Sequence, residues 1–327
     1  MKKYYYNFNS FLAKDLETYV NGKQAIGYKY KTEKLALHLL DKYIVESNII
    51  QITSITIKKL EEFLMSRNRS RPRSYNHLLS VIRNFFKWLM MDQNLQPIFQ
   101  FPEPRRAVSQ RLPFIFKDEQ AISLLKLTAK LPDNNKAKHR SEIYSVIFSL
   151  LYNLGLRVRE VSRLRIKDVE LNQQFLTICQ TKFNKTRYVP FGPKLKERLT
   201  KYFELCKLDF DKKENFLFTF DGYRSINPCT ISMVFHHLTS HMGLIIPPGT
   251  SPPRLHHLRH SFAVNTLLKW YQSGIDAGQK LIHLSTFLGH VDPTSTAVYL
   301  QITQELLRAA NDRFEQYAIK LLQGERQ

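Results

Sequence analysis

The first part of the chain carries apolar side chains at helical spacing. The clearest stretch runs from Ser74 to Met91, where apolar residues recur at Leu78, Leu79, Ile82, Phe85, Phe86, Leu89 and Met90. This spacing places them on one face of a helix, and Ser74 is a residue type that often caps a first turn. Similar patterns predict helices over three further ranges: Phe11–Val20, Lys31–Ser47 and Thr56–Met65. Together these helices predict a compact all-α module.

The composition changes at Gln96–Pro113. This stretch contains four prolines and three arginines: Pro97, Pro102, Pro104, Pro113, Arg105, Arg106 and Arg111. Proline cannot continue a helix, and it pushes the preceding residue towards extended backbone. We therefore expect a stiff, basic linker at residues 97–113, between an all-α domain at residues 1–96 and a second domain at residues 114–327. An internal loop is the alternative interpretation.

The second part of the chain combines helical spacing with two short strand patterns. Apolar residues at Ile143, Val146, Ile147, Leu150 and Leu151 predict a core helix, and the helical pattern returns from Leu195 to Leu205 and continues towards the end. Phe175–Gln180 and Arg187–Pro190 have the residue types of strands, and Asn184–Lys185 suits a hairpin turn between them. The predicted fold class is mainly α with two domains: an all-α N-terminal module and an α-rich second domain with a small antiparallel sheet.

The chain is strongly basic. Its 327 residues include 49 Lys and Arg against 28 Asp and Glu, which gives a formal net charge of +21. Such an excess favours a polyanion as partner, because contacts to phosphate groups supply an affinity that depends on salt. Charge does not distinguish DNA from RNA, so a ribosomal or RNA-binding role stays open at this point.

The sequence favours a cytoplasmic protein without a membrane partner. No apolar run approaches the roughly 20 residues that span a bilayer, and Met1–Tyr6 contains no apolar stretch fit for a signal peptide. The cysteines Cys179, Cys206 and Cys229 are far apart and form no CxxC pair. We expect neither a disulfide framework nor a zinc site, and we predict that the thiols are small buried groups in a reducing compartment.

Basic residues gather around the predicted helix at Ser74–Met91. Arginine occupies every second position just before this helix, and two further basic residues lie four apart on its polar face. Arginines beside a helix start suit contacts to phosphate. With two residues of the predicted linker, the candidate contacts to nucleic acid are Arg67, Arg69, Arg71, Arg73, Arg83, Lys87, Arg105 and Arg106. A solvated surface loop is the alternative for the arginine run.

Four short motifs of the second domain carry side chains suited to phosphodiester chemistry. They are Gly155-Leu156-Arg157-Val158-Arg159-Glu160, Lys182-Phe183-Asn184-Lys185-Thr186-Arg187-Tyr188-Val189-Pro190, His256-His257-Leu258-Arg259-His260, and Leu288-Gly289-His290 with Tyr299 nine residues after the histidine. A planar guanidinium grips two phosphate oxygens and stays charged, so two arginines can neutralise charge in a transition state. A histidine can pass protons near neutral pH. A tyrosine hydroxyl, with a pKa of about 10, needs nearby cations or a base before it attacks.

Together and in this order, the motifs resemble those of the tyrosine recombinases, the family of phage-type integrases, Xer-type resolvases and transposon recombinases. The resemblance implies a catalytic set of six residues: Arg157, Lys182, His256, Arg259, His290 and Tyr299. In this family the tyrosine attacks the scissile phosphate and becomes joined to a DNA 3′ end, which points to Tyr299 as the nucleophile. Glu160 and His260 would have supporting places, with Glu160 orienting its surroundings and His260 supporting the helix.

Lys182 would act as general acid on the leaving 5′ oxygen. The family usually has Gly-Lys-Gly where this chain has Thr181-Lys182-Phe183, so Lys185 stays open as the rival candidate. His256 and His260 lie four residues apart, as metal ligands can, but no acidic or cysteine partner follows at a fitting distance. We expect no metal and no cofactor, because cationic side chains would stabilise the phosphate.

The implied function is a site-specific recombinase that cleaves and rejoins duplex DNA through a covalent 3′-phosphotyrosine. The connection Lys269–Phe287 is longer than in Xer-type resolvases and resembles that of mobile-element recombinases, which favours integration, excision or transposition. Xer-type dimer resolution, relaxation by a type IB topoisomerase and DNA binding without catalysis stay open. The family works as four protomers on two sites, so the expected partners are duplex DNA and a homo-tetramer, with a related recombinase left open. The expected location is the bacterial cytoplasm, on the nucleoid.

The end of the chain has an apolar stripe at helical spacing. Within Gln304–Leu322 it comprises Leu306, Leu307, Ala310, Phe314, Tyr317, Ala318 and Leu321. In the family such a final helix docks into a neighbouring protomer, and packing on its own domain is the alternative.

Overall fold

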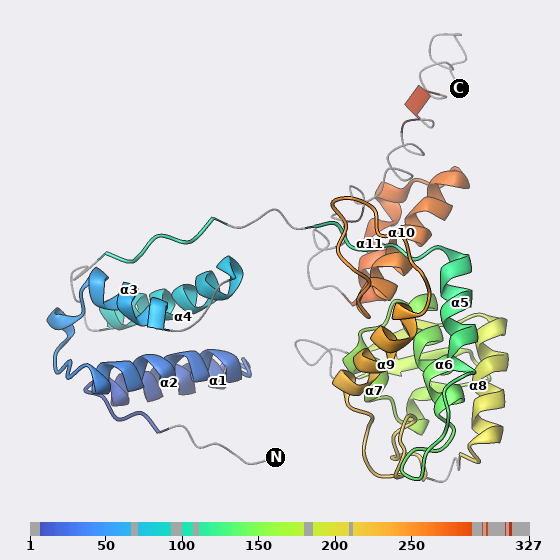
Figure 1. The fold of residues 1–327 in the computed structure, drawn as a ribbon, viewed down its shortest axis with the longest axis horizontal. Helices are drawn as coiled ribbons and strands as arrows, with labels where there is room; N and C mark the ends of the chain where they lie inside the picture. Colours follow the sequence, from blue (N-terminus) through green and yellow to red (C-terminus); the bar gives the residue numbers. More distant parts are fainter. Residues whose placement is uncertain are drawn as a thin grey trace. The chain divides into compact units, whose positions relative to one another are not determined.

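The computed structural model describes residues 7–66, 71–92, 100–106, 111–179, 186–208 and 212–289, together with Thr296, Tyr299, Asn311, Phe314 and Glu315. The chain divides into two compact units, Met1–Gln110 and Arg111–Gln327 (Figure 1). Each unit has its own hydrophobic core. The predicted domain bounds, residues 1–96 and 114–327, remain a proposal.

The described part of the first unit is helical. Its elements are α1 (Ala13–Ala25), α2 (Lys31–Glu46), the 3-10 turn η1 (Ile52–Ser54), α3 (Ile57–Ser66) and α4 (Pro72–Asp92). α4 contacts each of the other three α-helices, and its apolar face, which includes Phe85 and Phe86, is buried in the core. The helices predicted from apolar spacing in this unit are confirmed.

α4 begins two residues before Ser74. Pro72 takes the first helical position, where its missing N–H removes no helix hydrogen bond. The carbonyl of Arg71 accepts the N–H groups of Ser74 at 3.0 Å and Tyr75 at 3.2 Å. The prediction of Ser74 as the capping residue is therefore wrong, because Ser74 already lies in the first turn.

Part of the segment assigned to the linker packs on α4. The side-chain amide of Asn76 donates to the carbonyl of Arg105 and accepts from its N–H, both at 2.8 Å. Arg83 donates to the carbonyl of Pro102 at 2.9 Å. These contacts attach residues 101–106 to the first unit.

The described part of the second unit is mainly helical. Its helices are α5 (Asp118–Thr128), α6 (Arg140–Asn153), α7 (Val158–Ser162), the 3-10 turn η2 (Ile166–Asp168), α8 (Pro193–Leu205), α9 (Pro228–Ser240), α10 (His257–Gln272) and α11 (Ala277–Leu288). α6 contacts α5, α7, α8 and α10, and Figure 1 shows it within this group. Residues 143, 144 and 146–151 of α6 are all buried, so α6 is the core helix that the apolar spacing at residues 143–151 predicts.

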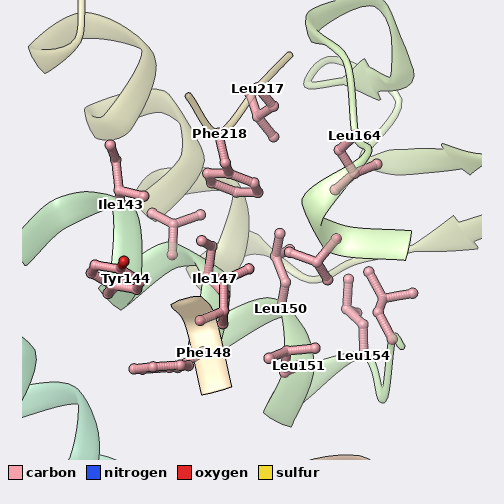
Figure 2. Close-up of a cluster of buried hydrophobic side chains, with 14 of the residues drawn as sticks. Ile143, Tyr144, Ile147, Phe148, Leu150, Leu151, Leu154, Leu164, Leu217 and Phe218 are labelled. Carbon is pink, nitrogen blue, oxygen red and sulfur yellow. The ribbon is translucent and has the colours of Figure 1, made fainter. Parts of the chain in front are cut away.

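Figure 2 shows how the core forms around α6. Side chains of α6, among them Ile147, Phe148 and Leu150, meet Leu217 and Phe218 from the segment between α8 and α9. The loss of any of these side chains would leave a cavity in a close-packed interior.

A small antiparallel sheet packs on this core. Within the described residues its strands are β1 (Val169–Glu170), β2 (Phe175–Ile178) and β3 (Arg187–Pro190), in that order. Leu176 pairs with Val189 and Ile178 pairs with Arg187, so one face contributes Leu176, Ile178 and Val189 to the core. Both predicted strands and the predicted fold class are confirmed. β1 was not predicted, because a strand of two residues has no visible period.

The cysteines are less buried than expected. Cys206 has intermediate exposure, whereas Cys179 and Cys229 are exposed. The prediction of buried thiols is wrong for the last two, since Cys179 follows the end of β2 and Cys229 lies in the first turn of α9. Within the part of the chain that the structure describes, no helix is both long and apolar enough to cross a bilayer.

Candidate active site

The first motif forms a tight turn between α6 and α7. Gly155 has a φ of +58°, and a Cβ there would lie 2.5 Å from the Phe262 ring and 2.9 Å from the Leu288 side chain. Only glycine accepts both this backbone conformation and this close approach without strain. The turn therefore lies against α10 and α11, and it places Arg157 at the start of α7.

Arg259 joins this turn to the end of α11. Its side chain is 1% exposed, and its guanidinium donates to the carbonyls of Gly155 at 2.6 Å and Leu288 at 2.8 Å. Burial, together with the positive charge of Arg157, lowers the pKa of Arg259 to about 10. The guanidinium is thus charged at neutral pH and fixed in one orientation.

Glu160 is a buried carboxylate shared by two arginines. It accepts the N–H and Nη1 of Arg157, both at 2.9 Å, and the Nη1 and Nη2 of Arg187 at 3.0 and 2.9 Å. Burial opposes the charged carboxylate, but the hydrogen bonds and charges of Arg187 and Arg157 hold the pKa of Glu160 below its usual value. Glu160 thus holds both guanidiniums in place, and the orienting role predicted for it stays a prediction.

The C-terminal end of α11 collects guanidinium groups. Three successive carbonyl oxygens, those of Phe287, Leu288 and Gly289, accept from Arg187 at 3.0 Å, Arg259 at 2.8 Å and Arg157 at 3.0 Å respectively. The last carbonyls of a helix lack partners within the helix and carry partial negative charge, so cations are stabilised there. Gly289, with a φ of +68°, ends the helix in the left-handed conformation. Residues from three sequence motifs therefore converge at this point.

Tyr299 lies beside this arginine cluster. It is 4% exposed, and its hydroxyl is 3.0 Å from Nδ1 of His260. Burial raises the pKa of Tyr299, while the charge and hydrogen bond of Arg259 and the charge of Arg157 act in the opposite direction. The phenol is therefore protonated at neutral pH, close to the groups that could activate it.

The three histidines at the start of α10 have different surroundings. His256 is exposed, and its ring centre lies 4.8 Å from that of His260. His257 is buried, and its Nδ1 accepts the N–H of Arg254 at 3.1 Å. His260 contacts Tyr299, a contact that the supporting role predicted for His260 did not include: position 260 lies one residue after Arg259 and reaches the same cluster.

Three of the residues predicted from the motifs lie outside the described residues. They are Lys182, its rival Lys185, and His290. Their neighbours are placed, since β3 begins at Arg187 and the carbonyl of Gly289 is bonded to Arg157.

Arg187 is a member of the cluster that the sequence motifs did not assign to the site. A signal existed: Arg187 and Val189 are two apart in β3 and so share the face of the strand that packs on the core. A charged side chain on a core-facing position requires a buried partner, and the partner is Glu160.

The candidate DNA contacts divide into three groups. Arg67 and Arg69 lie outside the described residues, whereas five are exposed: Arg71, Arg73, Lys87, Arg105 and Arg106. Arg105 also stacks over the ring of Tyr75, at 4.0 Å from its centre. Arg83 is half-buried and bonded to Pro102, so it holds the chain rather than presenting a free cation on the surface of α4.

Within the described residues, no group of three or more His, Cys, Asp or Glu side chains is arranged to hold a metal ion. The charge that could neutralise a phosphate comes here from guanidinium groups.

Comparison with known proteins identifies the family. The model of the phage integrase family matches residues 116–305, which contain all four motifs. The chain belongs to this family of tyrosine recombinases, whose members cleave and rejoin DNA.

Curated relatives cover most of the chain. The protein y4rB of Sinorhizobium fredii, named as an integrase/recombinase, is 28% identical over 92% of this chain and 96% of its own length. The tyrosine recombinase XerC of Staphylococcus carnosus is 27% identical over 75% of this chain and 76% of its own length.

Solved structures share the fold. The XerH recombinase bound to a palindromic difH substrate has a TM-score of 0.65 at 20% identity, over 92% of this chain and 84% of XerH. The Tn1549 transposon integrase in complex with a circular intermediate DNA has a TM-score of 0.62 at 17% identity, over 92% of this chain and 99% of the integrase chain.

Proposed function

We propose that this protein is a site-specific recombinase in which Tyr299 forms a covalent bond to DNA. The observation that supports it most directly is the convergence of Arg157, Arg259 and Tyr299 from distant parts of the sequence. Two guanidiniums beside a buried phenol have the chemistry that a phosphodiester exchange requires.

The proposed reaction is a transesterification at phosphorus. The phosphate binds to Arg157 and Arg259, whose charges balance the charge that grows on its oxygens. The phenol oxygen of Tyr299 forms a bond to phosphorus while the bond from phosphorus to the 5′ oxygen breaks. The phenol proton passes to a base, and Nδ1 of His260, 3.0 Å away, is placed to receive it. The leaving 5′ oxygen takes a proton from Lys182, with Lys185 as the rival donor.

Rejoining runs the same steps in reverse. A 5′ hydroxyl from the partner duplex attacks the phosphotyrosine, and Tyr299 leaves. The energy of the phosphodiester is kept in the protein–DNA bond, so the proposal includes neither a nucleotide cofactor nor a metal. Adduct formation is therefore expected to continue in the presence of EDTA. His256 and His290 would donate to phosphate oxygens in both directions.

Duplex DNA is the proposed partner, and the net charge of +21 supports it. The lambda integrase has been solved as a tetramer bound to a Holliday junction, and we extend this assembly to four copies of the present chain on two sites. The exposed Arg71, Arg73 and Lys87 are the proposed phosphate contacts of the first unit. A second, related recombinase in the assembly and an action on the nucleoid in the cytoplasm belong to the same proposal.

The proposed biological role is integration, excision or transposition of a mobile element. Its support is the longer connection before the fourth motif and the likeness to the Tn1549 transposon integrase. Dimer resolution is the second candidate, supported by the identity to XerC. Docking of residues 304–322 into a neighbouring protomer stays a prediction. Within this segment the structure describes only Asn311, Phe314 and Glu315.

Covalent capture tests the proposal without knowledge of the target site. Sheared, lightly nicked DNA of the source organism is incubated with the protein, detergent strips non-covalent complexes, and the retained fragments are sequenced. Nicks trap the adduct, because the cleaved strand piece diffuses away before rejoining. We expect the wild-type protein to retain fragments that share one sequence, and Tyr299→Phe to retain none. Absence of any adduct with the wild-type protein would contradict the proposal.

The same material separates recombinase from topoisomerase. Once the shared sequence is known, two plasmids that differ only in this site are compared. A recombinase forms adducts and exchanges strands only on the plasmid with the site, whereas a type IB topoisomerase relaxes both.

A further inference from the structure

Arg187 uses all three of its side-chain nitrogens for hydrogen bonds within the active-site cluster. Its Nε donates to the carbonyl of Phe287 at 3.0 Å, and its Nη1 and Nη2 donate to the two carboxylate oxygens of Glu160 at 3.0 and 2.9 Å. The side chain of Arg187 is 12% exposed, whereas that of Arg157 is 33% exposed. A phosphate can therefore approach Arg157 more readily than Arg187.

These contacts connect separate parts of the site. Glu160 belongs to the first motif and also binds Arg157. Phe287 directly precedes the two residues whose carbonyls bind Arg259 and Arg157. Arg187 itself opens β3 and belongs to the second motif. One side chain thus joins the first, second and fourth motifs.

Arg187 also limits how strongly Glu160 can bind Arg157. The carboxylate accepts from both arginines, so its charge is shared between two guanidiniums. Without Arg187, the whole negative charge of Glu160 would face Arg157, and a two-bond ion pair between them would become favourable. Such a pair would turn Arg157 away from Gly289 and neutralise the guanidinium charge of Arg157 that would otherwise bind the phosphate.

Arg187 also packs closely against Gly289, the residue that ends α11. A Cβ on Gly289 would lie 2.7 Å from Nη1 and 2.9 Å from Cζ of Arg187. The guanidinium therefore packs directly against the residue that precedes His290. The position of Gly289, which ends α11 in the left-handed conformation, is therefore tied to the position of Arg187.

We propose that Arg187 is a positioning residue for the recombination reaction. It holds Glu160 and the end of α11 so that Arg157 keeps its orientation towards the phosphate. Both of its Nη atoms are paired with the Glu160 carboxylate, so we assign it no contact with the phosphate. This inference rests on the proposed function, because it concerns the same site.

The test compares the rate of chemistry with DNA affinity and folding. The probe is a nicked duplex that carries the sequence recovered by covalent capture, and adduct formation is followed at saturating DNA. We expect Arg187→Gln to slow adduct formation by about a hundredfold, as small misplacements of catalytic groups do, and to change the Kd for the duplex less than about threefold. Arg187→Lys keeps the charge but not the two-pronged geometry, so it should recover only part of the rate.

Arg198→Gln is the matched control. Arg198 is a half-buried arginine of the same unit that donates to the hydroxyls of Ser145 and Ser149 and lies outside the cluster. Arg198→Gln should lower the thermal midpoint of unfolding about as much as Arg187→Gln does. It should leave the cleavage rate within about twofold of wild type, since no catalytic group contacts Arg198. A wild-type rate for Arg187→Gln, or an equal loss of rate for Arg198→Gln, would overturn the inference.

A second measurement covers the case in which Arg187→Gln folds poorly. Gly289→Ala introduces a Cβ against the guanidinium, so it should slow cleavage more in the wild-type background than in Arg187→Lys, whose ammonium lacks the contacting Nη1 and Cζ atoms. Equal effects in the two backgrounds would contradict the proposed contact. If the wild-type protein forms no adduct at all, the proposed function is wrong. If the wild-type protein forms the adduct and the Arg187 variants form it at the same rate, only the role given to Arg187 is wrong.

Discussion

Nδ1 of His260 lies 3.0 Å from the phenol oxygen of Tyr299. The two rings face each other at an angle of 59°, with centres 5.4 Å apart. Burial and the charge of Arg259 lower the pKa of His260 to about 4, so its ring is neutral at pH 7 and can accept a proton. The pKa of Tyr299 is raised by burial, so the phenol needs such an acceptor when it attacks.

Loss of the imidazole should therefore slow the chemical step. We expect His260→Leu to reduce adduct formation at saturating DNA by about a hundredfold, the lower range for loss of a general base. DNA affinity, measured by fluorescence anisotropy, should stay within about threefold, because the proposed proton transfer acts on the chemical step rather than on binding. His283→Leu, at an exposed position of α11, controls for the loss of a histidine. Equal rates for the two variants would show that His260 is not part of the reaction.

Arg259 and Arg157 should differ in their effect on stability. Arg259→Ala leaves the buried carbonyls of Gly155 and Leu288 without their donor, which should cost about 3 kcal/mol of unfolding free energy. Arg157 is one-third exposed, so Arg157→Ala should cost less than about 1.5 kcal/mol while still abolishing cleavage. Urea unfolding followed by Trp270 fluorescence in a Trp88→Phe background reports on the second unit. A smaller loss for Arg259→Ala than for Arg157→Ala would contradict the role given to Arg259.

Gly155 should tolerate no side chain. Gly155→Ala combines a left-handed backbone with a Cβ 2.5 Å from the Phe262 ring, so we expect a loss of about 2–4 kcal/mol in the same unfolding assay. Gly192 has a φ of −84°, and a Cβ there would meet no atom within 4 Å, which makes Gly192→Ala the control. The control should cost less than about 1 kcal/mol. Equal stability of the two variants would mean that the turn before Arg157 is not held as tightly as the geometry indicates.

Stability should fall in mild acid because His257 is buried in its neutral form. Burial, with the nearby charges of His260, Arg254 and His236, lowers the pKa of His257 from 6.5 to about 4, and its Nδ1 must stay unprotonated to accept from Arg254. A depressed histidine pKa means that the unfolded chain binds the proton first, so the contribution is present above pH 6.5 and is lost as the pH falls towards 4. The loss from this group should reach about 3 kcal/mol.

The measurement is the unfolding free energy of the second unit between pH 7 and pH 4. His257→Gln, which can still accept from Arg254, should reduce this dependence in part, because the lowered pKa of His260 contributes to it as well, whereas His283→Gln should leave it unchanged. An unchanged slope in His257→Gln would assign the acid sensitivity to other groups.

Much of the fold could be predicted from the sequence, because the buried face of a helix or strand requires apolar residues at regular intervals along the chain. The apolar stripe of α4, the apolar spacing of α6 and the residue types of β2 and β3 all correspond to observed elements. Element ends were harder to predict: α4 begins at Pro72 rather than Ser74, since a proline suits the first position of a helix. β1 has two residues and therefore no pattern at all.

The site was predictable only in part. Motif order identified Arg157, Arg259 and Tyr299, which the structure brings together. The partnership of Arg187 with Glu160 could not be derived from spacing, because the two residues are 27 positions apart and meet only when β3 packs beside α7 and α11. The contact between His260 and Tyr299, 39 positions apart, was missed for the same reason.

The most direct test of the proposed chemistry is to identify the residue that becomes bonded to DNA. The captured adduct is digested with nuclease and trypsin, and the peptides are analysed by mass spectrometry. We predict a nucleotide attached through its 3′ phosphate to the phenol oxygen of Tyr299. A nucleotide on any other side chain, with Tyr299 unmodified in the same adduct, would contradict the assignment of the nucleophile and the mechanism that depends on it.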